Sequence, residues 1–386
     1  MKKIAIVGGG AAGLFAAAYL STYKNYDITI FEKNNRVGKK LLLTGNGKCN
    51  ITNTNISDYC FNDNNFYNML KYFSNNDTID FFNSIGLLTK TDSEGRVYPY
   101  SESSNTVVNV LLSQLIKNKV SIICDCEILS IMNNNKSFNL IDSLNRNYEA
   151  DVVILASGGK TYYKMTNSYD LATNLNHTIS KLSPSLVGLK TQENLSMIQN
   201  IRFKSNVRLF VDNNCVYQDS GELFFKKDGL SGIVMFQITS ILNRYTHYKK
   251  AKVLVDLMPE YSFDTLNRMF KSKKCDFNNL LDGIFPKPIS QYIYKSLKST
   301  SIDDLVNLIK SLPFNIVEPY SFENAQVTSG GVLLDEIDHK TMMSKKHNDL
   351  YIIGELLNLD GLCGGYNLQI AWTTAALCAN SIRKDS

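Results

Sequence analysis

The sequence predicts an α/β fold in which a dinucleotide-binding Rossmann domain is interrupted by an inserted domain. Its first 32 residues have the pattern strand, glycine-rich turn, helix and strand, which is one βαβ unit. Two later apolar runs, at residues 151–156 and 350–353, also lead into glycine-rich turns. Between them, from about residue 189, short alternating strands and then helices replace this pattern.

The opening unit carries a dinucleotide-binding motif. Residues 4–7 predict a buried strand, and GGGAAG follows directly at residues 8–13. Gly8 permits the tight turn, Gly10 lets the backbone approach a pyrophosphate, and Gly13 lets the next helix pack closely on the sheet. The helix N-terminus then offers N–H groups and a positive dipole end to phosphates.

Glu32 completes this motif at the end of the second strand, residues 28–31. Its carboxylate can accept hydrogen bonds from a ribose diol, and its charge would repel a 2′-phosphate. The motif therefore indicates FAD or NAD rather than NADP. A secretory signal peptide is the alternative for this lysine- and alanine-containing start, but cleavage would remove the glycines and leave Glu32 without a role.

Composition narrows the class of protein. The 386 residues are 44% hydrophobic and 20% charged, which suits a globular protein of two domains or one domain with an insertion. No apolar run approaches the roughly 18 residues of a membrane span. The net charge of +5 is mild, and we find no dense Lys/Arg cluster, so nucleic acid is not indicated as a partner.

The cysteines do not predict a metal site or a disulfide framework. Eight cysteines occur without a C-x-x-C pair, and only four histidines accompany them. A C-x-x-x-x-C redox pair is absent as well, which argues against the disulfide-reductase mechanism. We expect a cytoplasmic protein without metal.

The region after Glu32 contains a second glycine-rich stretch, TGNGKCNITN at residues 44–53. Such a loop can wrap a heterocycle or phosphates through its backbone N–H groups, and an ordinary Asx-rich turn is the alternative. A linker with a short helix follows at residues 54–78, then a turn that carries Arg96 and Tyr98, and a helix at residues 105–117. Four short strands, at residues 120–124, 127–132, 138–141 and 147–149, are expected to form a β-meander.

The last segment returns to cofactor chemistry. The strand at residues 151–156 ends in SGGK, and the strand at residues 350–355 ends in Glu355. A glycine-rich loop at residues 360–369 then enters a helix, whose N-terminus could stabilise negative charge on a flavin ring. Two glycine-rich turns at opposite ends of the chain fit a long cofactor, so FAD fits better than NAD. We predict FAD-domain segments at residues 1–189 and 324–386 and an inserted domain at residues 190–323.

Together these motifs resemble the BaiN/YhiN-like flavoproteins, a group also described as aminoacetone-oxidase-like. The shared motifs are GGGAAG with Glu32, the stretch at 44–53, GRVYP at 95–99, ASGG at 156–159, GLSG at 229–232, TSGGV at 328–332, and GE, DG and GGYNLQ within 354–369. The resemblance implies a glutathione-reductase-like FAD domain, a β-barrel-like insertion and a small helical subdomain. It also implies that at least one member reduces oxidised bile acids. Lys48 stands where an arginine is usual and Cys363 where a threonine is usual.

The residues and the resemblance together give the candidate site. The candidate cofactor-binding residues are Gly8, Gly10, Ala11, Ala12, Gly13, Glu32, Lys33, Lys40, Thr44, Gly45, Asn46, Asn50, Ser157, Gly158, Gly354, Glu355, Asp360, Gly365, Asn367, Leu368 and Gln369. Tyr98, Arg96 and Tyr366 are the candidate proton donors or substrate anchors, with structural roles as the alternative.

The leading functional hypothesis is an FAD-dependent oxidoreductase. We expect it to pass hydride from NADH or NADPH through flavin N5 to an activated C=C of a small or steroid-like substrate. One alternative is an amine or alcohol oxidase that uses O₂. Another is an FAD-binding protein whose insertion binds RNA or a protein partner.

Overall fold

The structure is a computed structural model that describes residues 1–23, 25–134, 136–161 and 168–384. The chain divides into two units. Unit 1 comprises Met1–Ser183 and Val327–Ser386, and unit 2 comprises Pro184–Gln326. The sequence analysis placed the insertion at residues 190–323, and unit 2 extends a few residues beyond both of these limits.

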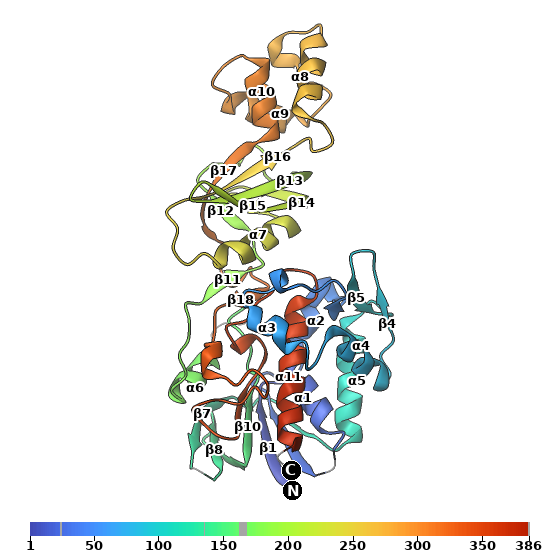
Figure 1. Cartoon of the computed structure of the whole chain (residues 1–386), viewed down its shortest axis with the longest axis vertical. Helices are drawn as coiled ribbons and strands as arrows, with labels where there is room; N and C mark the ends of the chain where they lie inside the picture. The colour runs from blue at the N-terminus through green and yellow to red at the C-terminus, as the bar shows by residue number, and fades with distance from the viewer. Residues whose placement is uncertain (24, 135, 162–167, 385–386) are drawn as a thin grey trace. The chain divides into compact units, whose positions relative to one another are not determined.

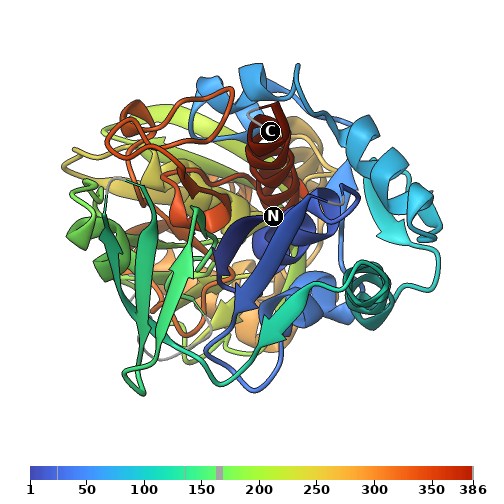
Figure 2. The same ribbon diagram turned by 90° about the horizontal axis from the view of Figure 1, so that it is seen from below.

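A five-stranded sheet with the order β19-β10-β1-β2-β6 organises unit 1, and all its strand pairs are parallel (Figure 2). The strands are β1 (Lys2–Val7), β2 (Tyr26–Phe31), β6 (Ser121–Ile123), β10 (Val152–Leu155) and β19 (Leu350–Ile352). All four residues of β10 are buried, as expected for a strand covered on both faces.

Two helices pack together against this sheet. In α1 (Ala11–Leu20) eight residues are buried, and its small side chains allow close approach to α11 (Tyr366–Lys384). Phe15 of α1 lies 5.2 Å from Trp372 of α11, measured between ring centroids. The hydroxyl of Tyr26 donates to the carbonyl of Ile382, so the last helix returns to the start of the chain (Figure 1).

The remaining elements of unit 1 form two smaller sheets and several helices. The small sheets are β3 (Thr52–Asn53), β5 (Arg96–Pro99) and β4 (Thr89–Thr91), and β7 (Ile128–Asn133), β8 (Phe138–Asp142) and β9 (Asn147–Ala150). The helices are α2 (Lys39–Leu43), α3 (Asn64–Met69), α4 (Asn75–Ser84), α5 (Ser104–Lys117) and α6 (Ser168–Asn174). The predicted meander was wrong in one strand, because β6 pairs with β2 in the parallel sheet.

Unit 2 contains a closed barrel with the strand order β12-β15-β14-β13-β16-β17. Its strands are β12 (Leu189–Thr191), β13 (Arg202–Val211), β14 (Asn214–Lys226), β15 (Gly229–Ser231), β16 (Ala251–Asp256) and β17 (Leu312–Pro319). The expected short alternating strands include a long one, β14, which stays paired with β13 through a single bulge.

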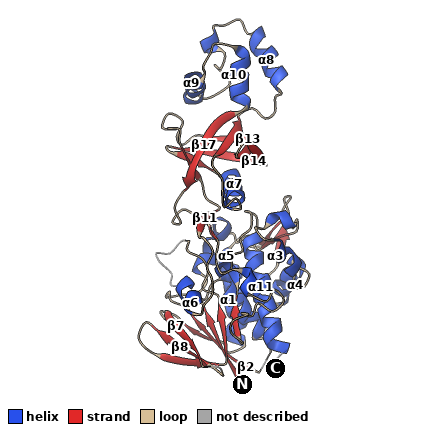
Figure 3. Ribbon diagram, turned by 60° about the vertical axis from the view of Figure 1, so that its left-hand side comes forward, coloured by secondary structure: helices blue, strands red, loops and turns tan. Residues whose placement is uncertain are grey.

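Four helices complete unit 2. They are α7 (Ile233–Asn243), α8 (Phe263–Ser272), α9 (Lys287–Ser296) and α10 (Ile302–Lys310). Figure 3 shows α8, α9 and α10 grouped beside one end of the barrel. Short strands β11 (Ser183–Ser185) and β18 (Val327–Ser329) mark the passages between the units.

The predicted fold class is confirmed: a parallel Rossmann sheet interrupted by a β-barrel insertion with a helical subdomain. Within the described ranges, no helix has the length and apolar character needed to span a membrane.

Candidate active site

Four predicted motifs meet at one edge of the parallel sheet. The glycine-rich turn follows β1, Glu32 follows β2, Ser157 and Gly158 follow β10, and Gly354 follows β19. These four strands are consecutive neighbours and run in the same direction. Their carboxyl ends therefore share the edge at which open α/β sheets bind ligands.

Gly10 precedes α1, and the surrounding protein does not itself require a glycine there. Its φ of −82° suits any residue, and a Cβ built on it meets no atom of the described residues within 4 Å. By contrast, a Cβ on Gly8 would lie 2.5 Å from the Ala156 carbonyl oxygen, and one on Gly13 would lie 2.0 Å from the Gly8 carbonyl oxygen. Gly8 and Gly13 serve packing, whereas Gly10 leaves open the space that a pyrophosphate would need.

The N-terminus of α1 suits an anion. No side chain caps this helix and its first turn holds no acidic residue. The first N–H groups of a helix lack partners within it, and the dipole is positive at this end. Ala11 and Ala12 leave these groups accessible to a phosphate, and a Cβ on Gly354 would lie 2.8 Å from that of Ala12.

The Glu32 carboxylate is held beside the glycine-rich turn. Its Oε2 accepts a hydrogen bond of 2.8 Å from the Gly9 N–H. Its Oε1 accepts hydrogen bonds from the N–H and the side-chain amide of Asn34, at 2.8 and 2.6 Å. A carboxylate has about four acceptor positions, so a ribose diol can still be bound. Lys33 lies partly exposed in the loop that follows.

Lys40 and Glu355 connect segments that are far apart in sequence. Lys40 Nζ donates to Glu355 Oε2 at 2.5 Å and to the Thr161 hydroxyl at 2.6 Å. Glu355 Oε1 accepts the Thr328 N–H at 2.9 Å. A Cβ on Gly159 would lie 2.6 Å from Glu355 Oε1. This cluster at the ends of β10 and β19 combines the charges and hydroxyl groups that suit the ribityl and phosphate parts of a cofactor.

The Thr44–Asn50 loop has an unusual backbone. Positive φ values of 56°, 54°, 84° and 58° occur at Gly45, Asn46, Gly47 and Cys49. Turns of this kind, such as right-handed Lys48 followed by left-handed Cys49, can direct backbone N–H groups toward one concave side, where an anion can be bound. The Asn50 Oδ1 atom is buried without a hydrogen-bond partner in the described part of the chain. Such an atom requires a partner, and a bound cofactor would supply one.

Side chains at the start of α11 are mostly engaged by the protein itself. Asn367 bonds the backbone of Gly361, and the buried Asp360 accepts from the Ser329 hydroxyl. The Gln369 amide bonds three threonine hydroxyls, those of Thr52, Thr78 and Thr373. Leu368 packs against the core. The N-terminus of α11 therefore offers backbone N–H groups to a cofactor rather than these side chains.

Gly365 brings α11 close to the Thr44–Asn50 loop. Its φ is 98°, and a Cβ there would lie 2.6 Å from the Thr52 carbonyl and 2.8 Å from Asn50 Oδ1. Glycine is required here by both conformation and contact. These contacts place the unpaired Asn50 atom beside the start of α11.

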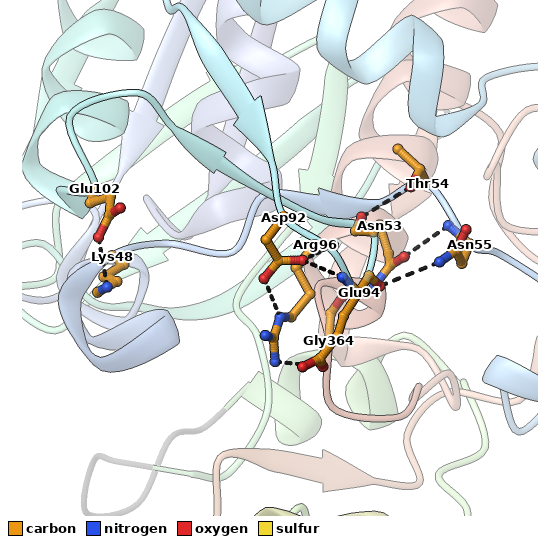
Figure 4. Close-up of polar contacts among 10 residues, drawn as sticks. Lys48, Asn53, Thr54, Asn55, Asp92, Glu94, Arg96, Glu102 and Gly364 are labelled. Carbon is orange, nitrogen blue, oxygen red and sulfur yellow. Dashed lines mark hydrogen bonds and ion pairs between the residues drawn. The ribbon is translucent and has the colours of Figure 1, made fainter.

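The three candidate catalytic residues differ in whether their polar groups already have partners in the protein. Arg96 Nε lies 2.8 Å from Asp92 Oδ2, and its Nη1 lies 3.0 Å from Glu94 Oε2 (Figure 4). Tyr366 donates its hydroxyl to the Asn55 carbonyl at 3.1 Å. Both groups are therefore already engaged.

Tyr98 differs from these two residues. It is half-buried, and no described residue hydrogen-bonds its hydroxyl. Burial raises its pKa above 10, although the charge of Arg96 opposes this shift. Tyr98 also interacts electrostatically with Cys363 and Lys48, so the hairpin, the Thr44–Asn50 loop and the loop before α11 converge around it.

Of the two nearby cysteines, Cys49 is buried and Cys363 is partly buried. Burial raises the pKa of the Cys49 thiol to about 12, and burial also raises that of Cys363. Neither thiol has the environment of a reactive thiolate. Within the described residues, no group of three or more His, Cys, Asp and Glu side chains could hold a metal.

Several supporting residues were not predicted from the sequence. Glu102 binds Lys48 and Lys90 at 2.6 and 2.5 Å, and these two bonds lower its pKa to about 2. Thr161 and Thr328 complete the Lys40–Glu355 cluster. No local pattern marks these residues, because the partners in these bonds are 12 to 121 positions away.

Comparison with known proteins identifies relatives over nearly the whole length. The family described as HI0933-like protein Rossmann domain matches residues 2–381. A 3-dehydro-bile acid delta(4,6)-reductase from Clostridium scindens is 34% identical, with 99% of each chain covered. Ribosomal RNA dihydrouridine synthases from Escherichia coli and Haemophilus influenzae are 27% and 26% identical, with at least 97% of each chain covered.

A solved structure supports the fold. The 3-ketosteroid delta1-dehydrogenase from Sterolibacterium denitrificans matches with a TM-score of 0.52 at 11% identity, with both chains fully covered. At that identity the similarity concerns the fold alone.

Proposed function

Because the chain belongs to the HI0933-like family of FAD-dependent oxidoreductases, we propose that it reduces a C=C bond conjugated to a carbonyl group. The names of the relatives support this choice. A 3-dehydro bile acid with Δ4,6 unsaturation is a conjugated dienone, and dihydrouridine is uridine without its C5=C6 double bond. In both cases the reduced bond is polarised by a carbonyl, so one chemistry covers both substrates.

The reaction adds a hydride and a proton across the C=C bond. Bound FAD would supply the hydride, which it receives from NADH or NADPH. The chain itself would bind the substrate, exclude water and deliver the proton to the carbon next to the carbonyl. Glu32, Lys40, Glu355 and the α1 N-terminus are the residues that would hold the FAD.

The observation that carries this proposal is that no residue in the described part of the chain hydrogen-bonds the Tyr98 hydroxyl. An ordinary phenol is already protonated at neutral pH and can donate its proton, and burial raises the pKa of Tyr98, which keeps it in the protonated form. The hydroxyls or charges of Tyr366 and Arg96 are occupied by Asn55, Asp92 and Glu94. We therefore assign proton donation to Tyr98 and positioning of the hairpin to Arg96.

The first test is spectroscopic. The purified protein is mixed anaerobically with NADH or NADPH, and the flavin absorbance is followed before a conjugated enone is added. Rapid bleaching followed by enone-dependent recovery is expected. A flavin that stays oxidised with both nucleotides, or that recovers only with O₂, would contradict the proposal.

The second test concerns Tyr98. Tyr98→Phe should keep its FAD and be reduced normally, but recover with the enone roughly 100-fold more slowly. Tyr100→Phe is the matched control, because Tyr100 lies just beyond the same strand with 64% of its surface exposed. Equal rates in the two variants would remove Tyr98 from the mechanism.

A uracil base in RNA is a second candidate substrate, and the charge distribution favours it. Unit 2 holds 18 Lys and Arg against 14 Asp and Glu, a net charge of +4 out of +5 for the whole chain. The sequence analysis judged charge over the full length and so missed this asymmetry. Cations gathered on one domain are typical of proteins that bind nucleic acid.

A further inference from the structure

One stretch of unit 2 concentrates cations and aromatic rings at the surface. Residues 244–252 read RYTHYKKAK, and no Asp or Glu occurs from residue 229 to residue 255. Residues 245–250 are all exposed, with Tyr245 and Tyr248 at 38% and 39%. This segment connects α7 to β16 and is yellow in Figure 1.

Backbone hydrogen bonds hold this segment in place and leave its lysine side chains without ion pairs among the described residues. Asp212, in the turn between β13 and β14, accepts the N–H groups of Lys249 and Lys250 at 2.9 and 3.0 Å. Its own N–H donates to the Lys250 carbonyl at 3.0 Å. Asp212 therefore binds the backbone, and the described residues provide no ion pair to Lys249, Lys250 or Lys252 side chains.

The adjoining barrel surface continues the same composition. Lys252 of β16 lies opposite Phe210 of β13 in register. Its Nζ is 5.4 Å from the Phe210 ring centroid, and the Arg208 guanidinium is 6.0 Å from the same ring. We define the basic face as Phe210, Tyr245, Tyr248, Lys249, Lys250 and Lys252.

We propose that the basic face binds single-stranded RNA. This inference rests on the proposed function, because it identifies the substrate of the reductase as a uracil base within an RNA strand. Unpaired lysines attract phosphates, and accessible aromatic rings stack on unpaired bases, which is the combination found in single-strand-binding proteins. A membrane surface would favour exposed leucine, isoleucine or tryptophan, and residues 245–250 contain none of these.

RNA binding is tested by fluorescence anisotropy, in which the FAD-loaded protein is titrated into a fluorescein-labelled oligouridylate of about 12 nucleotides. The triple variant Lys249→Ala, Lys250→Ala, Lys252→Ala should bind at least about tenfold more weakly. The slope of log affinity against log salt should fall by about 2, since each lost phosphate contact contributes about 0.7. Tyr245→Ala with Tyr248→Ala should weaken binding about tenfold and leave the salt slope unchanged.

A matched control removes the same charge elsewhere in unit 2. Lys287, Lys295 and Lys298 are exposed on or beside α9, and their triple alanine variant should bind the probe as the parent does. Equal weakening in both triple variants, or a parent that does not bind the probe, would overturn the inference. So would tighter binding of an acidic peptide or an anionic vesicle to the same lysines.

The two proposals fail separately. If the protein reduces a conjugated steroid enone with NAD(P)H but does not bind the oligouridylate, the proposed function is supported and the RNA-binding inference is refuted. If the protein binds the RNA through the basic face but neither nucleotide reduces its flavin, the RNA-binding inference is supported and the proposed function is refuted. Unchanged flavin absorbance in every variant confirms that unit 1 is intact.

Discussion

At the scale of single residues, some positions of the cofactor site can be changed without disturbing the fold. Gly10 is the clearest example. No atom in the described ranges lies within 4 Å of a Cβ built on it, and its φ is ordinary. We predict that Gly10→Val folds normally but loses FAD, because the new side chain occupies the space for the pyrophosphate. Flavin absorbance per protein, read beside circular dichroism and the thermal midpoint, measures this.

Gly221→Ala provides the control for that substitution. The added Cβ would lie 3.6 Å from that of Val234, an ordinary contact in unit 2. It should retain FAD fully. A yellow, fully loaded Gly10→Val protein would mean that the pyrophosphate does not pass this turn.

Glu336 makes a pH-dependent contribution to stability. Although burial opposes ionisation, hydrogen bonds from Lys346, the Thr178 N–H and His177 hold its pKa at about 2 against an ordinary 4.5. The folded protein thus prefers the carboxylate more strongly than the unfolded chain does. Its contribution, on the order of 3 kcal/mol, is complete above pH 4.5 and is lost as the pH falls toward 2.

Urea unfolding at several pH values between 6 and about 3 tests this contribution. We predict that Glu336→Gln is less stable at neutral pH and loses less stability below pH 4.5 than the parent. Glu318→Gln is the control, because the side chain of Glu318 is 58% exposed in its ion pair with Lys190 and should contribute little. Parallel pH profiles for Glu336→Gln and the parent would refute the assignment.

At the scale of elements, local sequence patterns predicted where strands and helices occur better than they predicted which strands pair with each other. The periodicity of residues 105–117 predicted α5, since amphipathic spacing is a local property. The short strand β6 could have joined the meander or the parallel sheet, and its register with β2, Thr29 opposite Ser121, decides between them. That choice depends on long-range packing, which sequence spacing does not contain.

The same limit applies to the site. Glycines and Glu32 could be placed because each satisfies a local geometric demand of the βαβ turn. The role of Gln369 could not, because it depends on threonines from β3 and α4 that lie about 300 positions away. Tyr98 was recognised as a candidate. That its hydroxyl has no hydrogen-bond partner among the described residues, whereas the Tyr366 hydroxyl has one, could be seen only in three dimensions.

Gln369 joins α11 to its neighbours, which leads to an element-scale prediction. Its buried amide bonds Thr52, Thr78 and Thr373 at 2.6 to 2.9 Å. Gln369→Leu should remove the acceptor of the Thr52 hydroxyl, whereas Thr78 and Thr373 still donate to the Ser74 and Phe73 carbonyls. The free energy of unfolding should therefore fall by roughly 1–3 kcal/mol. FAD content of the folded protein at low temperature should be unchanged, because the amide is already occupied. Loss of FAD without loss of stability would instead make Gln369 a direct cofactor ligand.

For the whole molecule, we propose that the division into units separates cofactor binding from substrate recognition. Every candidate cofactor residue belongs to unit 1, and the hydrophobic cluster around its parallel sheet consists of unit 1 residues alone. Unit 2 contributes the barrel and the basic face. A chain that leaves one domain and later returns to it can do so only where its two passages lie close together.

Unit 1 meets that condition, which allows the units to be tested apart. Near the passages, the Ser180 N–H donates to the Gly331 carbonyl and the Gly331 N–H to the Ser180 hydroxyl, both at 2.9 Å. Replacing residues 184–326 by a Gly/Ser linker of about four residues should therefore cost little loop entropy. We predict a folded, yellow protein with FAD content near that of the parent and no binding of the oligouridylate. Absorbance, circular dichroism and anisotropy measure the three properties. A folded but colourless product, even after FAD is added, would show that unit 2 supplies part of the cofactor site.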